Sequence, residues 1–365
     1  MNYIGVDLHK KVISVCVILQ DGRARKVAER ATFRCAEPEK IKAWFHRQTP
    51  FQVALEATAS YEWFVQLVEP LASRVVLVHP KKMRVIAESK NKSDKLDAFV
   101  IAEFLALDML PEAYRPTPRQ REHRVLVRHR AYVQGRITSV KNKLRRILAN
   151  YNADIQSLFS VEGRQYLAKF QLLNADRIVA DALQAELDQH ETRLQDADRA
   201  LLEFARQAPV AEREARAVLE TVPCVGAVTT EVVLSELGDI RRFRSQKQVA
   251  AYAGLAPGER SSAGRSHQLG ITKEGSPLLR WVMIQTAWRL VGKTRRWGLV
   301  YEQLRQRMNA KKAIVAVARR LLCVMASLLR SGQAYRMSSE AAVPRPPAGR
   351  AASRGRLSAG RPAEC

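Results

Sequence analysis

The chain has 365 residues, of which 47% are hydrophobic, so it is long enough to bury the cores of two or three domains. Its 61 lysine and arginine residues outnumber its 36 acidic residues, which gives a formal net charge of +25. This surplus predicts a polyanionic partner, by default nucleic acid, because cationic side chains release the counterions condensed on it. No apolar run reaches the roughly 18 residues of a membrane span. The nearest candidate, residues 313–329, contains Arg319 and Arg320, so we expect no membrane partner.

The first 110 residues alternate between predicted strands and helices. Apolar, β-branched runs predict strands at residues 1–7, 12–19, 26–33, 52–56 and 74–79. Helical spacing of apolar residues predicts helices at residues 37–46, 60–71 and 93–107. This order indicates an α/β domain over residues 1–110, with a mixed sheet flanked by helices, which is the ribonuclease-H topology.

Four acidic residues of this domain are candidates for a metal site. Asp7 and Glu56 end two predicted buried strands, where a carboxylate costs several kcal/mol unless it is paired or binds a cation. Asp94 and Asp97 lie three residues apart at the start of a predicted helix, so both project from one face. Taken singly, each has a plainer explanation as a cap or a solvated side chain. Taken together, they predict a site for Mg²⁺, with two ions about 4 Å apart, in phosphodiester chemistry.

Residues 111–215 are predicted to form a basic helical stalk. Three prolines, the last of them Pro118, mark its boundary, and a long basic helix then runs to Asn150. Apolar residues spaced alternately by three and four predict a coiled coil or helical hairpin with a second stripe between Leu183 and Phe204. Two antiparallel packed helices are the plainest interpretation, and dimerisation is a second one. The basic flank of the first helix offers cations for nucleic acid: Arg128, Arg136, Lys141 and Arg145.

Residues 216–335 are predicted to form a mainly helical C-terminal domain. Pro223 to Gly226, followed by a helix at residues 227–237, resembles a helix-hairpin-helix element. In such an element the backbone N–H groups at the turn, here near Gly226, contact a phosphate, although a plain packing unit is equally consistent. Further helices are predicted at residues 276–291 and 311–329. Residues 336–365 contain few large apolar side chains and predict a disordered basic tail.

A stretch rich in Gly, Ser and Arg, residues 253–267, is predicted to form a loop between two helical regions. A serine is a weak nucleophile, but cations and backbone N–H groups can bind a scissile phosphate beside it. Arg260, Arg265 and Lys273 are near enough in sequence to do so. From the residues alone, a polar connection whose serines satisfy turns is the better interpretation.

Taken in order, these motifs resemble the IS110 family of transposases over about residues 1–330. The segments Ile4-Gly-Val-Asp7, Leu55-Glu-Ala-Thr58 and Asn91-Lys-Ser-Asp94-Lys-Leu-Asp97 resemble the Asp-Glu-Asp-Asp set of that family. Three later segments resemble the C-terminal transposase domain of the family: Pro223-Cys-Val-Gly226, Ala250-Ala-Tyr-Ala-Gly-Leu-Ala-Pro257 and Thr272-Lys-Glu-Gly-Ser-Pro-Leu-Leu-Arg280.

The resemblance implies a RuvC-like N-terminal domain, a coiled-coil stalk and a C-terminal domain with a catalytic serine. It places that serine on Ser262, with Ser261 as the near alternative. It implies a bacterial recombinase, cytoplasmic and associated with the nucleoid, that moves its own insertion sequence. Ser262 would attack the DNA phosphate to form a phosphoserine link, while the four acids hold Mg²⁺ at the same composite site.

The resemblance also implies several partners. These are donor and target DNA, a structured non-coding bridge RNA that pairs with both, and further copies of the chain, with dimers pairing into a tetramer. In such systems base pairing specifies the site while the protein contacts shape and backbone.

Three alternatives remain open. The first is a RuvC-like, metal-dependent, structure-specific DNA endonuclease that uses activated water, with a merely structural serine loop. The second is a nucleic-acid packaging protein, which would need neither Asp7 nor Glu56. The third is an actin-like sugar kinase, whose first strand also carries Ile-Gly-x-Asp. The missing Gly-Thr-Thr-type turn and the positive charge argue against it.

Overall fold

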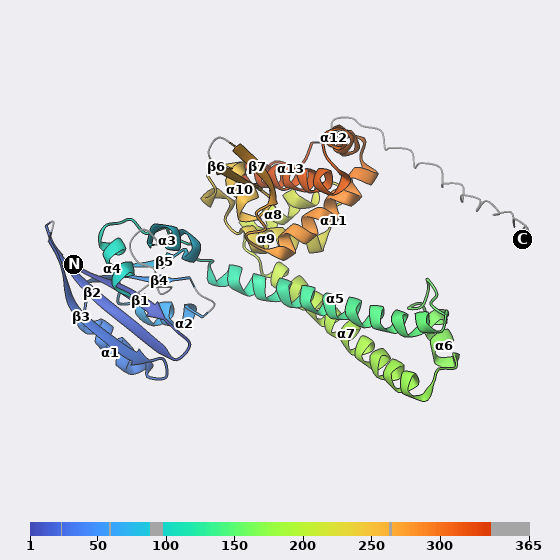
Figure 1. Cartoon of the computed structure of the whole chain (residues 1–365), viewed down its shortest axis with the longest axis horizontal. Coiled ribbons are helices and arrows are strands. Elements are labelled where there is room, and N and C mark those ends of the chain that lie inside the picture. The colour runs from blue at the N-terminus through green and yellow to red at the C-terminus, as the bar shows by residue number, and fades with distance from the viewer. Residues whose placement is uncertain (23, 58–59, 88–97, 263–264, 337–365) are drawn as a thin grey trace, which may run out of the picture. The chain divides into compact units, whose positions relative to one another are not determined.

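The computed structural model describes residues 1–22, 24–57, 60–87, 98–262 and 265–336 (Figure 1). The chain divides into two compact units, Met1–Pro116 and the part that begins at Thr117. Each unit buries hydrophobic clusters of its own. The predicted tail at residues 336–365 lies, except for its first residue, outside the described part of the chain.

A five-stranded mixed sheet forms the centre of the first unit. The strands are β1 (Asn2–Leu8), β2 (Val12–Asp21), β3 (Ala24–Arg34), β4 (Phe51–Glu56) and β5 (Arg74–Val78), in the spatial order β3-β2-β1-β4-β5. The first three pair antiparallel as consecutive hairpins, whereas β4 and β5 run parallel to β1. This arrangement confirms the predicted α/β unit with a mixed sheet.

Helices cover both faces of this sheet. Strand side chains point alternately to the two faces, and Ile4, Val6 and Leu55 join a core cluster with residues of α1 (Pro38–Arg47) and α2 (Glu62–Val68). Ala54 and Val76, on the other face, pack against α4 (Ala98–Ala106). A further helix, α3 (Pro80–Ala87), follows β5. The strand residues that share a face with Ala54 therefore lie on the α4 side.

Gly5 allows α4 to approach β1 closely. A Cβ atom at this position would lie 2.0 Å from the carbonyl oxygen of Ala98 and 2.4 Å from the backbone nitrogen of Ala102. Both of these are backbone atoms of α4, so a larger residue would require the helix to shift. The missing side chain at Gly5 thus sets the position of the first described turn of α4 against the middle of β1.

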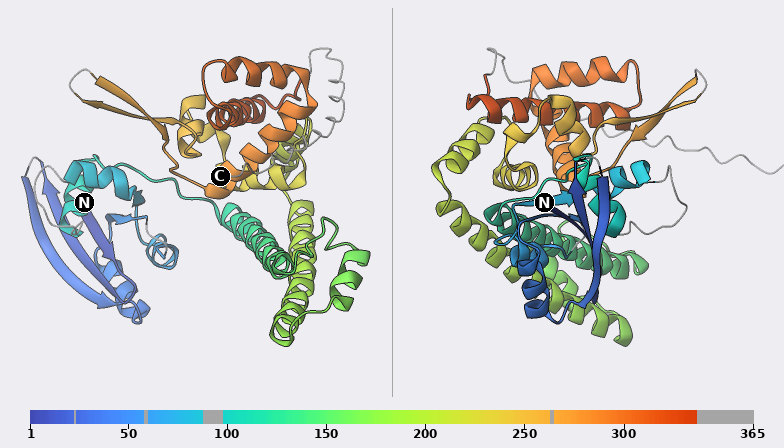
Figure 2. Two further views of the ribbon diagram at one scale, coloured as in Figure 1. Left: turned by 45° about the vertical axis from the view of Figure 1, so that its right-hand side comes forward. Right: turned by 90° about the vertical axis from the view of Figure 1, so that its left-hand side faces the viewer.

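Two long helices, α5 (Pro118–Asn150) and α7 (Asn174–Arg206), run side by side in the second unit and are joined through the short α6 (Val161–Lys169) (Figures 1 and 2). Thr117 caps α5 by accepting a hydrogen bond from the backbone N–H of Gln120 at 3.2 Å. Apolar residues of α5, among them Val140 and Leu144, pack against Leu183 and Leu187 of α7. These residues belong to the two predicted apolar stripes.

The remaining helices form the main core of the second unit. They are α8 (Val210–Glu220), α9 (Ala227–Leu237), α10 (Gln246–Tyr252), α11 (Pro277–Lys293), α12 (Arg295–Arg305) and α13 (Ala310–Ser331), with a short 3₁₀ turn at Ile240–Arg242. This region is mostly helical, as predicted. Among the described residues, no helix is both long and apolar enough to span a membrane.

One prediction for this region is wrong. Residues 253–267 were expected to form a loop, but the chain forms a two-stranded antiparallel hairpin of β6 (Pro257–Ser262) and β7 (Arg265–Ile271). The six residues of β6 include Pro, Gly and two Ser, and they contain no β-branched or aromatic side chain. Backbone hydrogen bonding across the pair, rather than strand propensity, therefore specifies this element.

Ion pairs hold the N-terminal half of α5 against α8 and α9. Glu236 of α9 is 2% exposed and accepts hydrogen bonds from Nε and Nη2 of Arg128, both at 3.0 Å. Glu231, one turn earlier, accepts from Nε of Arg216 at 2.6 Å and lies 2.5 Å from Nε2 of His123. Burial raises the pKa of Glu231, but its hydrogen bonds with His123 and Arg216 more than offset this effect and leave the pKa below its usual value of 4.5.

Substitution of Glu231 tests this network. A carboxyl whose pKa is lowered by folding stabilises the protein above its unfolded pKa, and this contribution is lost as pH falls towards the folded value. We expect Glu231→Gln to destabilise the protein by roughly 3–5 kcal/mol at pH 7, because it leaves buried cationic groups without their partner. The variant should also lose less stability than the parent between pH 5 and the acid limit, as measured by thermal unfolding.

The matched control is Glu214→Gln, which removes an exposed acid of α8 and should leave stability within about 0.5 kcal/mol. Equal destabilisation by the two substitutions would contradict a stabilising role for the Glu231 network.

Candidate catalytic site

Asp7 and Glu56 occupy equivalent positions at the carboxyl ends of adjacent parallel strands. Val6 of β1 is the register partner of Leu55 of β4, so the next residue on each strand is an acid. Neighbouring strands lie about 4.8 Å apart, and residues at matching positions of a parallel pair point to the same face. The alternation along β4 places Glu56 on the face of Ala54, which is the side covered by α4.

Neither carboxylate has a lysine or arginine partner among the described residues. Asp7 Oδ2 lies 3.0 Å from Nε2 of His9, whose side chain is mostly exposed, and the side chain of Asp7 is 23% exposed. Glu56 is half-buried. Two neighbouring acids repel each other, and a bound cation would relieve this repulsion. Carboxylate oxygens are also the ligands that Mg²⁺ prefers, so the pair fits a divalent metal.

The other two predicted ligands, Asp94 and Asp97, lie outside the described residues. Ala98, which follows Asp97 in the sequence, is the first described residue of α4. Its carbonyl oxygen packs against Gly5, two residues before Asp7. Within the described part of the chain, no group of three or more His, Cys, Asp or Glu side chains is arranged to hold a metal.

The predicted serine nucleophile lies at the end of β6. Ser262 is the register partner of Arg265, and this pair is the one farthest along the hairpin from Pro257. Ser261 pairs with Ser266, and Arg260 pairs with His267. Figure 2 shows the hairpin projecting from the helices of its own unit. The backbone therefore places both candidate serines and two of the predicted phosphate-binding arginines at the far end of an extended element.

The base of the hairpin is built from two glycines in close contact with opposite segments of the chain. Gly254 has φ +66°, and a Cβ there would lie 1.9 Å from the carbonyl oxygen of Glu274. Gly275 has φ +86°, and a Cβ there would lie 1.9 Å from the carbonyl oxygen of Tyr252. Only glycine combines this backbone conformation with such an approach. The two motifs on either side of the hairpin, residues 250–257 and 272–280, thus meet in space.

Arg280 holds this junction together. Its Nη1 donates to three backbone carbonyl oxygens, those of Ala253 at 3.2 Å, Glu274 at 3.1 Å and Gly275 at 3.0 Å. Lys273 closes the base by donating its backbone N–H to the carbonyl oxygen of Gly254 at 3.1 Å. The role of Arg280 was not predicted from the sequence, because every residue has a backbone carbonyl and the residue types therefore do not show which carbonyls accept from Arg280.

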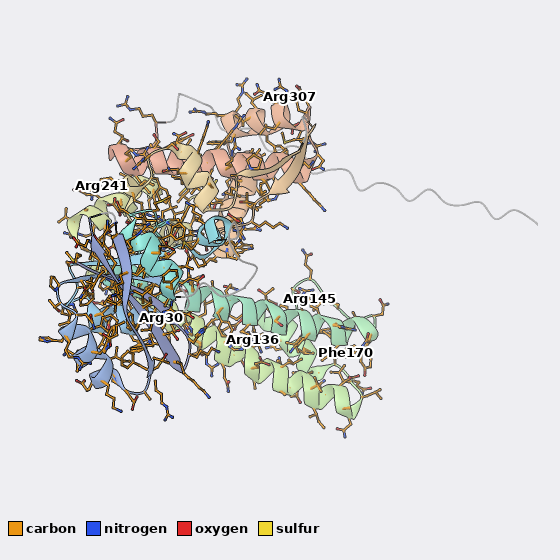
Figure 3. All side chains as sticks on the ribbon, turned by 60° about the vertical axis from the view of Figure 1, so that its left-hand side comes forward. Arg30, Arg136, Arg145, Phe170, Arg241 and Arg307 are labelled. Atoms are coloured by element: carbon orange, nitrogen blue, oxygen red, sulfur yellow. The ribbon has the colours of Figure 1, made fainter. Side chains whose placement is uncertain are left out.

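The four cations predicted to bind nucleic acid on α5 all form ion pairs within the second unit. The N–O distance is 2.9–3.1 Å in each of the four pairs: Arg128 with Glu236, Arg136 with Glu186, Lys141 with Glu191, and Arg145 with Asp154. Arg136 and Arg145 lie along the outer length of α5 (Figure 3). These pairs stabilise the packing of helices, and contact of the same groups with nucleic acid stays a prediction.

Gly226 lies at the N-terminal end of α9, after the turn that follows α8. It is exposed, and a Cβ atom there would meet nothing within 4 Å. Its φ of −108° is open to any residue. The turn is therefore accessible to a phosphate, as the helix-hairpin-helix interpretation requires, but Gly226 is not needed for its geometry.

Comparison with known proteins defines the class of this chain. A DEDD transposase model of the IS110 type, described as "Transposase", matches residues 4–153, which include β1 and β4 with their two acids. A second model, described as "Transposase IS116/IS110/IS902 family", matches residues 216–302, which include the serine hairpin and its base. Together the two matches cover more than half of the chain. The chain belongs to the IS110 family of transposases and is a DNA transposase, not a sugar kinase or a packaging protein.

Curated relatives match along most of their length. The transposase for insertion sequence element IS1111A of Coxiella burnetii is 24% identical over 352 residues, which cover 92% of each chain. A probable family 20 transposase of Pseudomonas aeruginosa is 25% identical, over 92% of this chain and 99% of the relative. The pilin gene-inverting protein of Moraxella bovis is 23% identical, over 92% of this chain and 97% of the relative.

The role of Arg280 can be tested through the amides that it helps to order. Arg280→Gln removes a charged donor shared by three carbonyls, a loss of about 1–3 kcal/mol in local stability. We expect hydrogen exchange at the amides of Thr272 and Lys273, which close the hairpin base, to accelerate about tenfold or more. The control is Arg289→Gln, an exposed arginine on the same helix, which should leave both amides unchanged. Equal exchange in the two variants would show that Arg280 does not hold the base.

Proposed function

We propose that this transposase breaks and rejoins DNA through a serine–phosphodiester intermediate at a Mg²⁺-dependent composite site. The observation that carries the proposal is the adjacent placement of Asp7 and Glu56 at the ends of parallel strands, without a lysine or arginine partner among the described residues. The family match supports the same assignment.

The acidic half of the site holds the metal. Asp7 and Glu56 supply two carboxylates on one face of the sheet, and Asp94 and Asp97 complete the set by their place in the family pattern. Divalent metal at such a site supplies positive charge to the attacking and leaving oxygens of the phosphodiester. The residues of this chain position that charge, because the close approach of Ala98 to Gly5 fixes α4 beside the strand of Asp7.

The serine half forms the covalent link. Oγ of Ser262 attacks the phosphorus and loses its proton, the P–O bond to the leaving sugar oxygen breaks, and that oxygen takes up a proton. The new phosphoserine ester conserves a phosphodiester bond, so a second DNA end can reverse the exchange and join the strands. Arg260, Arg265 and Lys273 belong to the same hairpin or its base and would neutralise the charge of the phosphate. Ser261 remains the alternative nucleophile.

Further copies of the chain and an RNA complete the proposal. The serine lies at the far end of a projecting hairpin, and the acids belong to the other unit, so a site shared between protomers is feasible in a dimer or tetramer. The packed helices α5 and α7 would serve as a coiled-coil stalk in that assembly. The formal charge of +25 supports binding of both DNA partners and of a structured bridge RNA that selects them, at the bacterial nucleoid.

The acids can be tested without changing DNA binding. Asp7→Asn and Glu56→Gln remove the charge of one ligand each, and we expect each to reduce strand cleavage on the order of 10³-fold. Binding of donor DNA should change less than tenfold, because the cationic surface is intact. The matched control is Glu39→Gln, which neutralises an exposed acid of α1 and should cleave like the parent. Normal cleavage by Asp7→Asn and Glu56→Gln would refute the metal site.

The serine can be tested by trapping the covalent product. DNA carrying one labelled strand should form a protein–DNA adduct that survives denaturing electrophoresis, and Ser262→Ala should abolish it. Ser261→Ala is the matched control one residue away and should retain the adduct. Loss of the adduct only in Ser261→Ala would move the nucleophile by one position. Cleavage that persists in both variants, without any adduct, would favour the endonuclease alternative.

A further inference from the structure

An arginine-lined cavity of about 430 Å³ lies between α12, α13 and the start of α10. Arg296, Arg319 and Arg320 line it, and none of the described residues around it is acidic. We call it the arginine cavity. It shares no residue with the strand acids or with the serine hairpin, and none of the predicted nucleic-acid contacts falls in it.

Cations far outnumber acids in the described segment that forms most of the arginine cavity. Residues 276–336 contain 13 lysine and arginine residues but a single acid, Glu302. Within the described ranges, no carboxylate forms an ion pair with Arg319 or Arg320. The arginines of α5 behave differently, since Arg128 and Arg136 each have a glutamate partner. Like charges gathered around one cavity repel each other, and a bound anion would remove this cost.

Ordered polar groups form one wall of the cavity. Trp297 is 5% exposed, and its Nε1 donates to the hydroxyl oxygen of Tyr335 at 3.1 Å. The hydroxyl of Tyr335 acts as the acceptor in this bond, so its own hydrogen can be donated to a ligand. The backbone N–H of Tyr335 donates to Oγ1 of Thr221 at 2.8 Å, which fixes this residue against the end of α8. The wall is therefore held in place before a ligand arrives.

The geometry points to a phosphate as the ligand. We propose that the arginine cavity binds a backbone phosphate of a nucleic acid held by the transposase. Guanidinium groups bind phosphate through paired N–H donors, and a tyrosine hydroxyl adds a further donor. A nucleic acid is favoured over a small anion because the cations continue along α12 and the start of α13, at Arg305, Arg307 and Lys311–Lys312. The inference rests on the proposed function only in that the partner is DNA or RNA.

Salt-dependent binding of the full chain tests the cavity. Each protein–phosphate contact contributes about 0.9 to the slope of log affinity against log salt for duplex DNA, and about 0.7 for a single strand. The variant Arg319→Gln with Arg320→Gln should lower the slope by roughly one to two units. The matched control, Arg193→Gln with Arg213→Gln, removes the same charge from exposed positions of α7 and α8 outside the cavity. All four arginines are exposed, so both variants should keep the fold.

Three probes distinguish the source of the phosphate: duplex DNA, single-stranded DNA, and a structured RNA transcribed from the DNA that flanks the gene. The probe whose slope falls more in the cavity variant than in the control variant is the one that the cavity holds. Equal slopes in the two variants for all three probes would overturn the proposal. A strand-cleavage assay of the parent chain tests the proposed function separately, because that function fails if the parent does not cleave DNA.

Cys323 gives a second readout that does not depend on substitution. It lines the cavity, and burial raises the pKa of its thiol despite the opposing effect of Arg319. Bound nucleic acid should slow its alkylation by a neutral maleimide severalfold relative to the free protein. Unchanged alkylation of Cys323, or equal protection by inorganic phosphate at the same phosphate concentration, would overturn a nucleic-acid site.

Discussion

The parallel pairing of β1 with β4 is the constraint on which the candidate acidic site of this transposase depends. Its register carries Asp7 and Glu56 to matching positions at the strand ends, where each lacks a lysine or arginine partner among the described residues. This placement is electrostatically unfavourable for the empty protein. Gly5 acts at the same place, since its missing side chain admits α4 against β1 two residues before Asp7. Both features make sense together if a divalent cation occupies the strand ends.

In the second unit, by contrast, several acids are paired with cations. Glu212 and Glu236 accept hydrogen bonds from arginines of α5, which hold that helix against α8 and α9. Glu231 accepts one from Arg216, which joins α8 to α9. Acids of α7 pair in the same manner with cations along α5. These pairs use cations that composition alone would assign to nucleic acid. The net surplus of the chain is therefore concentrated elsewhere, and residues 276–336, with 13 cations and one acid, are a major part of it.

The sequence indicates Asp7 and Glu56 as candidates more clearly than it indicates which cations are paired, for a physical reason. An acid at the end of a buried strand conflicts with its local environment, so Asp7 and Glu56 become candidates once they are considered together with the strands that carry them. The partner of Arg136 lies 50 residues away on α7, and no local pattern reveals it. The hairpin was missed because β6 lacks β-branched residues and β7 has only Ile271 at its end. Arg319 and Arg320 were used only to exclude a membrane span, since the cavity that they line is formed by three separate helices.

The position of the candidate serines depends on how the base of the hairpin is built. Gly254, Gly275 and Arg280 fix its base through backbone contacts that hardly depend on the side chains of β6 and β7. The far end then carries Ser262 away from the helices of its own unit, and the acids lie in the other unit. If the serine and the metal must meet on DNA, neither unit alone can cut a strand. Under the proposed function, cleavage would then require an assembly that brings both halves to one phosphate.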